Sequence, residues 1–150
     1  KCEGPDYNDA VIVDDVATGL VSSSPACLVV DSDRLFFRAY HPERGTELWK
    51  CEGPDYNEAE LVRDIAPGPS GSGIQSMILL NSKLFLGAGS AETGLELMVS
   101  DGSGPGTVMI QDIEPGTGSS TPRDLTVAGD RLFFVASTSK YGSEVWTAVP

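Results

Sequence analysis

The stretch Arg34-Leu35-Phe36-Phe37-Arg38-Ala39, followed by Gly45-Thr46-Glu47-Leu48-Trp49, recurs along the chain. It returns as Lys83-Leu84-Phe85-Leu86-Gly87-Ala88 with Gly94-Leu95-Glu96-Leu97-Met98, and as Arg131-Leu132-Phe133-Phe134-Val135-Ala136 with Gly142-Ser143-Glu144-Val145-Trp146. Alignment of the copies makes Lys1, Lys50, Val99 and Thr147 equivalent, so the repeat period is about 49 residues. Residues 1–150 therefore form a single repeat domain with modules 1–49, 50–98 and 99–146.

Each module contains four short segments of apolar and β-branched residues bounded by turn residues, a pattern typical of strands. The first segment falls at residues 10–14, 59–63 and 107–111, and the second at 27–30, 77–80 and 124–127. A short polar link joins the second segment to the Leu-Phe-Phe strand, which predicts an antiparallel hairpin. The Glu-Leu-Trp strand comes last. No helical period is present, so we predict an all-β fold.

A repeat period in the forties with β content indicates a β-propeller, with one four-stranded antiparallel blade per module. Three blades are fewer than the usual ring of about 4 to 8. Two copies would make a six-bladed ring, and neighbouring repeats of a longer propeller would also supply the missing blades. The chain begins with the segment at residues 10–14, which is available as the fourth strand of the last blade.

The composition restricts the partners. The formal net charge is −12 and no basic run interrupts it, so we expect neither nucleic acid nor an anionic membrane surface as a partner. The sequence contains no run of 18 apolar residues, so we expect no membrane insertion. The three cysteines include Cys2 and Cys51 at equivalent positions a whole module apart, beyond bridging distance, so we expect no disulfide framework.

The module resembles the ELWxxDGT repeat, a family of repeats in large bacterial surface or secreted proteins. Its motifs are matched best at Glu96-Leu97-Met98-Val99-Ser100-Asp101-Gly102-Ser103, and then by Gly106-Thr107, Asp112-Ile113, Pro115-Gly116 and Ser119-Ser120-Thr121-Pro122. The resemblance implies β-propeller blades and an extracellular or cell-surface setting, but it implies no catalytic residues. Met98 departs from the family Trp, and the first two modules carry Cys-Glu-Gly-Pro-Asp-Tyr-Asn in place of Asp-Gly-Thr.

Several residues recur at the same place in each module, and we interpret them as structural. They are Glu47, Glu96 and Glu144, then Asp15, Asp64 and Asp112, and the large apolar residues Trp49, Met98 and Trp146. Such carboxylates commonly accept hydrogen bonds from backbone N–H groups that would otherwise be unpaired. Two alternatives remain open, because repeated carboxylates can also line a channel or bind Ca²⁺.

Two further groups are candidate binding residues. The repeated turn Glu-Gly-Pro-Asp-Tyr-Asn offers Asp6, Asn8, Asp55 and Asn57 as metal ligands, although turn chemistry alone explains these residue types and the spacing is not that of an EF-hand. No cofactor is therefore predicted, with Ca²⁺ as the alternative. The polar loops after the Leu-Phe-Phe strand vary between modules, and they supply the candidate ligand-binding residues Tyr40, His41, Glu43, Glu92, Lys140 and Tyr141.

The sequence favours a non-enzymatic scaffold for protein interaction or structural assembly, acting through self-association or neighbouring repeats. The first alternative is a lectin with one site per blade, in which Trp49, Trp146, Phe36 or Phe133 stacks on sugars, although the placement of these aromatic residues on strands favours core packing. The second is a hydrolase with two channel carboxylates facing one pocket. His41 is the only histidine, and no Gly-x-Ser-x-Gly elbow or phosphate loop accompanies it.

Overall fold

The computed structural model describes residues 10–148, and within that range it contains eleven strands and no helix. The predicted all-β class is confirmed. The strands are β1 (Ala26–Asp31), β2 (Arg34–His41), β3 (Gly45–Glu52), β4 (Glu60–Arg63), β5 (Met77–Leu80), β6 (Lys83–Ser90), β7 (Gly94–Ser100), β8 (Val108–Gln111), β9 (Arg123–Ala128), β10 (Arg131–Thr138) and β11 (Gly142–Ala148).

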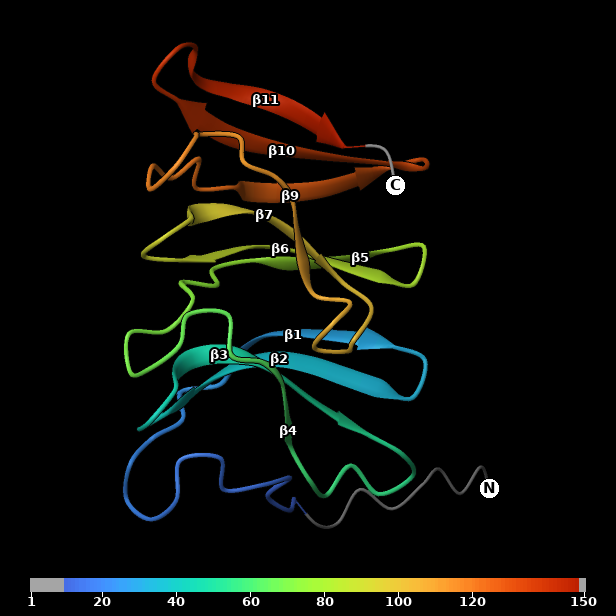
Figure 1. Cartoon of the computed structure of the whole chain (residues 1–150). Helices are drawn as coiled ribbons and strands as arrows, with labels where there is room; N and C mark the ends of the chain where they lie inside the picture. The colour runs from blue at the N-terminus through green and yellow to red at the C-terminus, as the bar shows by residue number, and fades with distance from the viewer. Residues whose placement is uncertain (1–9, 149–150) are drawn as a thin grey trace.

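The strands form three antiparallel meanders, one per module. Sheet A has the order β1-β2-β3-β4, sheet B the order β5-β6-β7-β8, and sheet C the order β9-β10-β11. The register of the central hairpin repeats, since Phe37 lies opposite Trp49, Leu86 opposite Met98 and Phe134 opposite Trp146. The three sheets stack face to face in chain order, from A to C (Figure 1).

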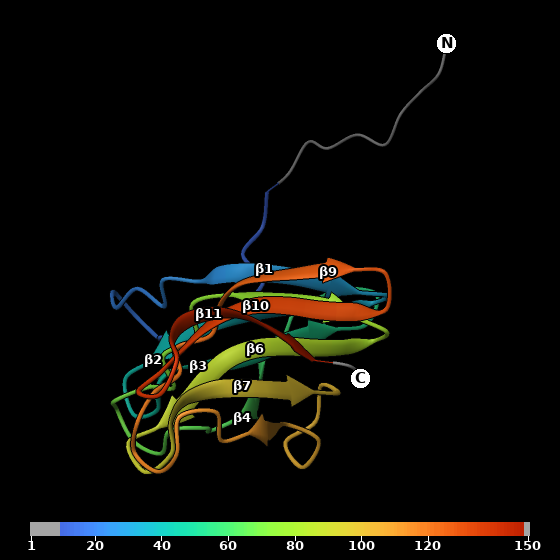
Figure 2. The same ribbon diagram turned by 90° about the horizontal axis from the view of Figure 1, so that it is seen from above.

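The first strands of the sheets, β1, β5 and β9, lie next to one another along one edge of the stack. Figure 2 shows β1 and β9 along this edge, with β4 on the opposite edge. The later strands of each sheet extend away from this shared edge.

Two apolar layers hold the sheets together. Phe36 and Leu48 of sheet A pack against Leu84, Leu86 and Met98 of sheet B. The opposite face of sheet B packs against sheet C through an equivalent layer, whose buried members are Leu80, Phe85, Leu97, Ile113, Leu132, Phe134 and Ala136. Each fully buried side chain of this size contributes roughly 1.5 to 3 kcal/mol, so these layers are the main cohesive element of the stack.

The predicted strand at residues 10–14 is wrong for the single chain. These residues form no strand, and Val11 and Ile12 are 83% and 77% exposed. The equivalent segments β4 and β8 are strands because β3 and β7 supply their hydrogen-bond partners. No strand within residues 10–148 pairs with residues 10–14, and an unpaired strand is not stable in water. Sheet C accordingly has three strands, with β11 at its open edge.

Cys27 and Cys51 are free thiols, while Cys2 lies outside the described residues. No helix that is long and apolar enough to cross a membrane is present between residues 10 and 148.

Candidate functional site

The Glu47 carboxylate, which begins the Glu-Leu-Trp motif on β3, is fully buried and holds the chain that follows sheet A. Its two oxygens accept hydrogen bonds from the backbone N–H groups of Ile65 at 3.0 Å and Ala66 at 3.2 Å. Burial raises the pKa of Glu47 to about 7, although hydrogen bonds from Ser72, Ile65 and Ala66 lower it. The carboxylate thus satisfies buried donors at the start of residues 64–76, the connection from sheet A to sheet B.

Glu96 repeats this arrangement on β7. It accepts from the backbone N–H of Ile113 at 3.0 Å, from the backbone N–H of Ser120 at 2.8 Å and from the Ser120 hydroxyl at 2.6 Å. Like Glu47 it is 0% exposed. It therefore anchors residues 112–122, the connection from sheet B to sheet C.

Glu144 occupies the same position on β11 but is exposed. Its sequence environment repeats that of Glu47 and Glu96, so the difference lies in its neighbours. In sheets A and B the connection after the fourth strand covers the glutamate, and no such connection follows β11 within residues 10–148. Of the three equivalent glutamates, Glu47 and Glu96 are therefore buried under a connection, whereas Glu144 is exposed.

The recurrent aspartates have separate local roles. Asp15 accepts from the Gly19 N–H and Asp112 from the Gly116 N–H, both at 3.0 Å. Asp64 instead pairs with Arg44 at 3.2 Å. These carboxylates shape the connections between sheets and do not meet in one pocket.

The six candidate ligand residues lie in or beside the turns β2–β3, β6–β7 and β10–β11. All three turns are on one side of the stack, at the left in Figure 1. Within each turn the contacts are local. The His41 Nδ1 accepts from the Glu43 N–H at 3.2 Å, and the Lys140 ammonium lies 4.7 Å from the centroid of the Tyr141 ring.

Two further contacts concern Glu92 and Tyr40. The Ser90 hydroxyl donates to Glu92 at 2.7 Å and holds the pKa of this exposed carboxyl below its usual range. Tyr40 is half-buried and donates its backbone N–H to the Ser23 carbonyl at 2.7 Å. A hollow of about 240 Å³ beside the β6–β7 turn is lined by Glu92 but by none of the other five candidates. The structure therefore brings these residues to one side without bringing them into a common site.

The metal candidates are not brought together either. Asp55 and Asn57 are exposed, and Asp6 and Asn8 lie outside the described residues. In the part of the chain that the structure describes, no three His, Cys, Asp or Glu side chains form a group that could hold a metal ion.

The repeated aromatic residues follow the sheet faces. Phe36 and Trp49 are buried, and the Trp49 indole N–H donates to the Ala39 carbonyl at 3.1 Å. Phe133 is only half-buried, because sheet C has no following sheet within the described residues. Trp146 is also half-buried, but it packs in the layer between sheets B and C.

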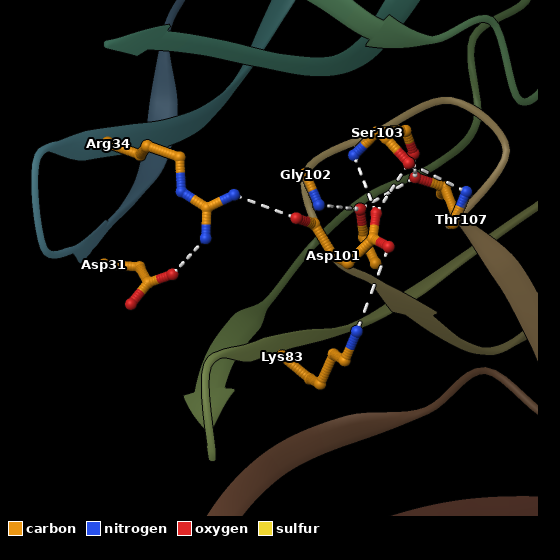
Figure 3. A network of polar contacts seen from close by, with 9 residues as sticks. Asp31, Arg34, Lys83, Asp101, Gly102, Ser103 and Thr107 are labelled. Atoms are coloured by element: carbon orange, nitrogen blue, oxygen red, sulfur yellow. Dashed lines mark hydrogen bonds and ion pairs between the residues drawn. The ribbon is translucent and has the colours of Figure 1, made fainter. Parts of the chain in front are cut away.

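The Asp-Gly-Ser turn between β7 and β8 carries a polar network that the sequence analysis missed (Figure 3). Arg34, at the start of β2, pairs with Asp31 and donates to the Asp101 backbone carbonyl at 2.9 Å. The Ser103 N–H and hydroxyl donate to the Asp101 carboxylate, and these bonds lower the pKa of Asp101. Lys83 lies 3.9 Å from the same carboxylate. The network connects sheet A to the turn between β7 and β8 of sheet B. Its sequence signal is the basic residue that opens each second strand.

Gly102, within this turn, has a φ of +88°, and a Cβ there would lie 2.7 Å from the Arg34 guanidinium and 2.9 Å from the Phe36 ring. We expect Gly102→Ala to lower the free energy of unfolding by about 2 to 4 kcal/mol, from φ strain and from displacement of Arg34 and Phe36. Gly53→Ala is the matched control, since Gly53 is the repeat equivalent, with a φ of +89° and no atom within 4 Å of an added Cβ. It should cost only about 1 to 2 kcal/mol. Equal losses in urea denaturation would show that the contact with Arg34 and Phe36 is unimportant.

The raised pKa of Glu47 predicts a pH-dependent stability. Between the unfolded value of 4.5 and the folded value of about 7, the folded state binds more protons than the unfolded state. The free energy of unfolding therefore falls as pH rises through this window, by about 3 kcal/mol from Glu47 alone. The amide introduced by Glu47→Gln cannot ionise. The difference in free energy of unfolding between this variant and the wild type, measured by urea denaturation, should therefore change by that amount between pH 4.5 and 7.5. A difference that is the same at both pH values would contradict the buried environment of Glu47.

The chain matches no protein-family model and no curated protein. A solved structure from a structural and mechanistic analysis of two prolyl endopeptidases aligns with 82% of this chain at 18% identity and a TM-score of 0.47. The aligned part is 20% of that chain, so the sequence spans about a fifth of its length. A likeness at this level identifies neither the family nor the activity of this chain.

Proposed function

We propose that this chain is a group of β-propeller blades of the ELWxxDGT type that acts as a non-enzymatic scaffold for protein interaction, in an extracellular or cell-surface setting. The observation that carries the proposal is the separation between a repeated framework and a variable loop side. The sheets, their apolar layers and the Glu47 and Glu96 anchors repeat, whereas the β2–β3, β6–β7 and β10–β11 turns on one side of the stack differ in sequence. A rigid framework with variable loops is the usual design of an interaction module.

The two alternatives have less support. A hydrolase would need two carboxyl groups facing one pocket, whereas the buried Glu47 and Glu96 face backbone N–H groups of separate connections. A lectin would need exposed aromatic residues at repeat-equivalent places, and Tyr141 has Arg44 and Thr93 at the aligned positions. The resemblance to surface-protein repeats also favours the scaffold.

The test uses the loop side. A variant with His41→Ala, Glu43→Ala, Glu92→Ala, Lys140→Ala and Tyr141→Ala should keep the wild-type unfolding midpoint, because these side chains contribute few buried contacts. Affinity capture from the surface and secreted fractions of the source cells should retain a protein with the wild type that is lost with the variant. Identical capture by both would contradict the proposal, and a glycan-array signal that is lost in the variant would favour the lectin.

A further inference from the structure

The third strand of each sheet (β3, β7 or β11) presents the same kind of surface. In sheets A and B the following connection covers this surface, and in sheet C no connection covers it within residues 10–148. On β3 and β7 the opening glycine lies directly against the following connection, Gly45 on Gly71 and Gly94 on Gly118, with no room for a Cβ. The glutamate two residues later is buried under the same connection. On β11 a Cβ at Gly142 would have no atom within 4 Å, and Glu144 is exposed. This surface is thus covered on β3 and β7, and its equivalent on β11 is uncovered.

Residues 15–25, the N-terminal connection, repeat local features of the two connections that cover Glu47 and Glu96. Asp15 accepts from Gly19 just as Asp112 accepts from Gly116 in the connection to sheet C. The Ser23 carbonyl accepts from the second strand of its sheet, as do the carbonyls of Ser72 and Ser120. Three equivalent positions also share a left-handed backbone, with φ of 44° at Ser24, 69° at Gly73 and 47° at Thr121.

The N-terminal connection has no equivalent glutamate beside it within the described residues. The N–H groups of Ile65 and Ala66 donate to Glu47, and those of Ile113 and Ser120 donate to Glu96. Their equivalents are Val16, Ala17 and Ser23, and no carboxylate within residues 10–148 accepts a hydrogen bond from any of these three. An uncovered glutamate and a connection without a glutamate are therefore present in the same molecule, at opposite ends of the stack.

The apolar surfaces match in the same way. Phe36 and Phe85 pack against the next sheet, and their equivalent Phe133 is half-buried on the open face of sheet C. At the other end, no further sheet covers the outer face of sheet A within residues 10–148, and Phe37 and Trp49 are buried there by single residues such as Val16 and Tyr56. A hollow of about 250 Å³ on this face is lined by Ile12, Val13, Val16, Leu28, Leu35 and Phe37. Phe133 of a second copy would meet Leu35 and Phe37, as Phe36 meets Leu84 and Leu86 within the chain.

We propose that two copies of this chain associate head to tail, with sheet C of each docked on sheet A of the other. Residues 10–14 of one copy add to β11 of the other as its fourth strand, and Glu144 accepts hydrogen bonds from the N-terminal connection at Val16, Ala17 and Ser23. Two chains of residues 1–150 together contain six sheets. This number is within the usual range of about 4 to 8, whereas three copies would give nine. The inference rests on the proposed propeller and specifies its closing contact.

The repeat also fixes the register of the added strand. Trp49 lies opposite Leu61 and Lys50 opposite Glu60, while Met98 lies opposite Met109 and Val99 opposite Val108. By equivalence, Trp146 of one copy lies opposite Ile12 of the other, and Thr147 opposite Val11. Val145, which is 73% exposed in the single chain, becomes part of an interior strand.

The first test is the absolute mass in solution by light scattering. The wild type should have twice the 15.8 kDa of the single chain. Glu144→Lys places an ammonium group against N–H donors and should give the single-chain mass, with an unchanged circular dichroism spectrum because Glu144 is exposed in the folded chain. Asp130→Lys is the control, since it makes the same charge change in the exposed β9–β10 turn and should leave the double mass. A wild type of single-chain mass, or a ladder of larger species, would overturn the proposal.

The second test is the register. A double variant with Val11→Cys and Thr147→Cys should form a covalent dimer on mild oxidation, because opposed residues have Cα atoms about 5 Å apart. Val11→Cys with Ser143→Cys, four residues along β11, should not. A double mass that survives Glu144→Lys, or cross-linking of both cysteine pairs alike, would overturn the assigned contact but leave the scaffold proposal intact. That proposal fails only in the loop-side capture experiment, which the monomeric Glu144→Lys chain can also perform.

Discussion

Glu96→Ala is expected to lower the free energy of unfolding by about 3 to 5 kcal/mol. The substitution removes the acceptor of three hydrogen bonds and leaves the Ile113 N–H, the Ser120 N–H and the Ser120 hydroxyl without a partner. A buried donor without an acceptor costs about 1 to 3 kcal/mol, and partial access of water reduces the sum. This loss is a large share of the stability of an ordinary domain, which is about 5 to 15 kcal/mol.

The repeat provides the control for Glu96→Ala. Glu144→Ala removes the same side chain from the equivalent position of β11, but Glu144 is exposed, so the expected change is below about 0.5 kcal/mol. Both variants should be compared by urea denaturation at a protein concentration at which light scattering gives the single-chain mass. Equal losses in the two variants would mean that the glutamate acts within its own strand and not through the connection it covers.

Phe85→Ala is expected to cost about 3 to 5 kcal/mol. Phe85 is 3% exposed and lies between sheets B and C, in contact with the layer that contains Leu132 and Phe134. Truncation to Ala removes the apolar surface that the ring buries and leaves a cavity that two paired sheets cannot close by small shifts, because both are held by their own hydrogen bonds.

Phe133→Ala is the matched variant for this layer. Phe133 occupies the same place in module 3, but its ring is half-buried on the open face of sheet C, so the monomer should lose only about 1 kcal/mol. Thermal and urea denaturation of the two variants give the comparison. A loss of more than about 3 kcal/mol for Phe133→Ala in the monomer would contradict the open face of sheet C.

Much of the fold was predictable because the same pattern of strand segments recurs in three modules. The Leu-Phe-Phe and Glu-Leu-Trp segments are short runs of apolar residues joined by short turns, so their hairpins depend on local signals that a sequence contains. Residues 10–14 carry similar apolar signals but form no strand in the single chain, because a strand also requires a neighbour, and the neighbour is not a property of the segment.

The candidate site was less predictable for the same reason. Glu47, Glu96 and Glu144 are indistinguishable in the alignment, and only the position of the following connection makes two of them buried and one exposed. The contact between Arg34 and the Asp101 carbonyl joins residues 67 positions apart, and the sequence shows only a basic residue and a turn. Loop residues such as His41 and Lys140 were expected in the polar loops after the Leu-Phe-Phe strand, but their local contacts within separate turns followed only from the structure.

The central claim is that the glutamate of each covered third strand holds the connection to the next sheet. Amide hydrogen exchange, measured by NMR, tests it most directly at Ile65, Ala66, Ile113 and Ser120, whose N–H groups donate to Glu47 and Glu96. These four amides should exchange slowly, close to the rate set by global unfolding, and Glu96→Ala should release Ile113 and Ser120 alone. Exchange of the four amides as fast as that of the exposed β9–β10 turn would contradict the account.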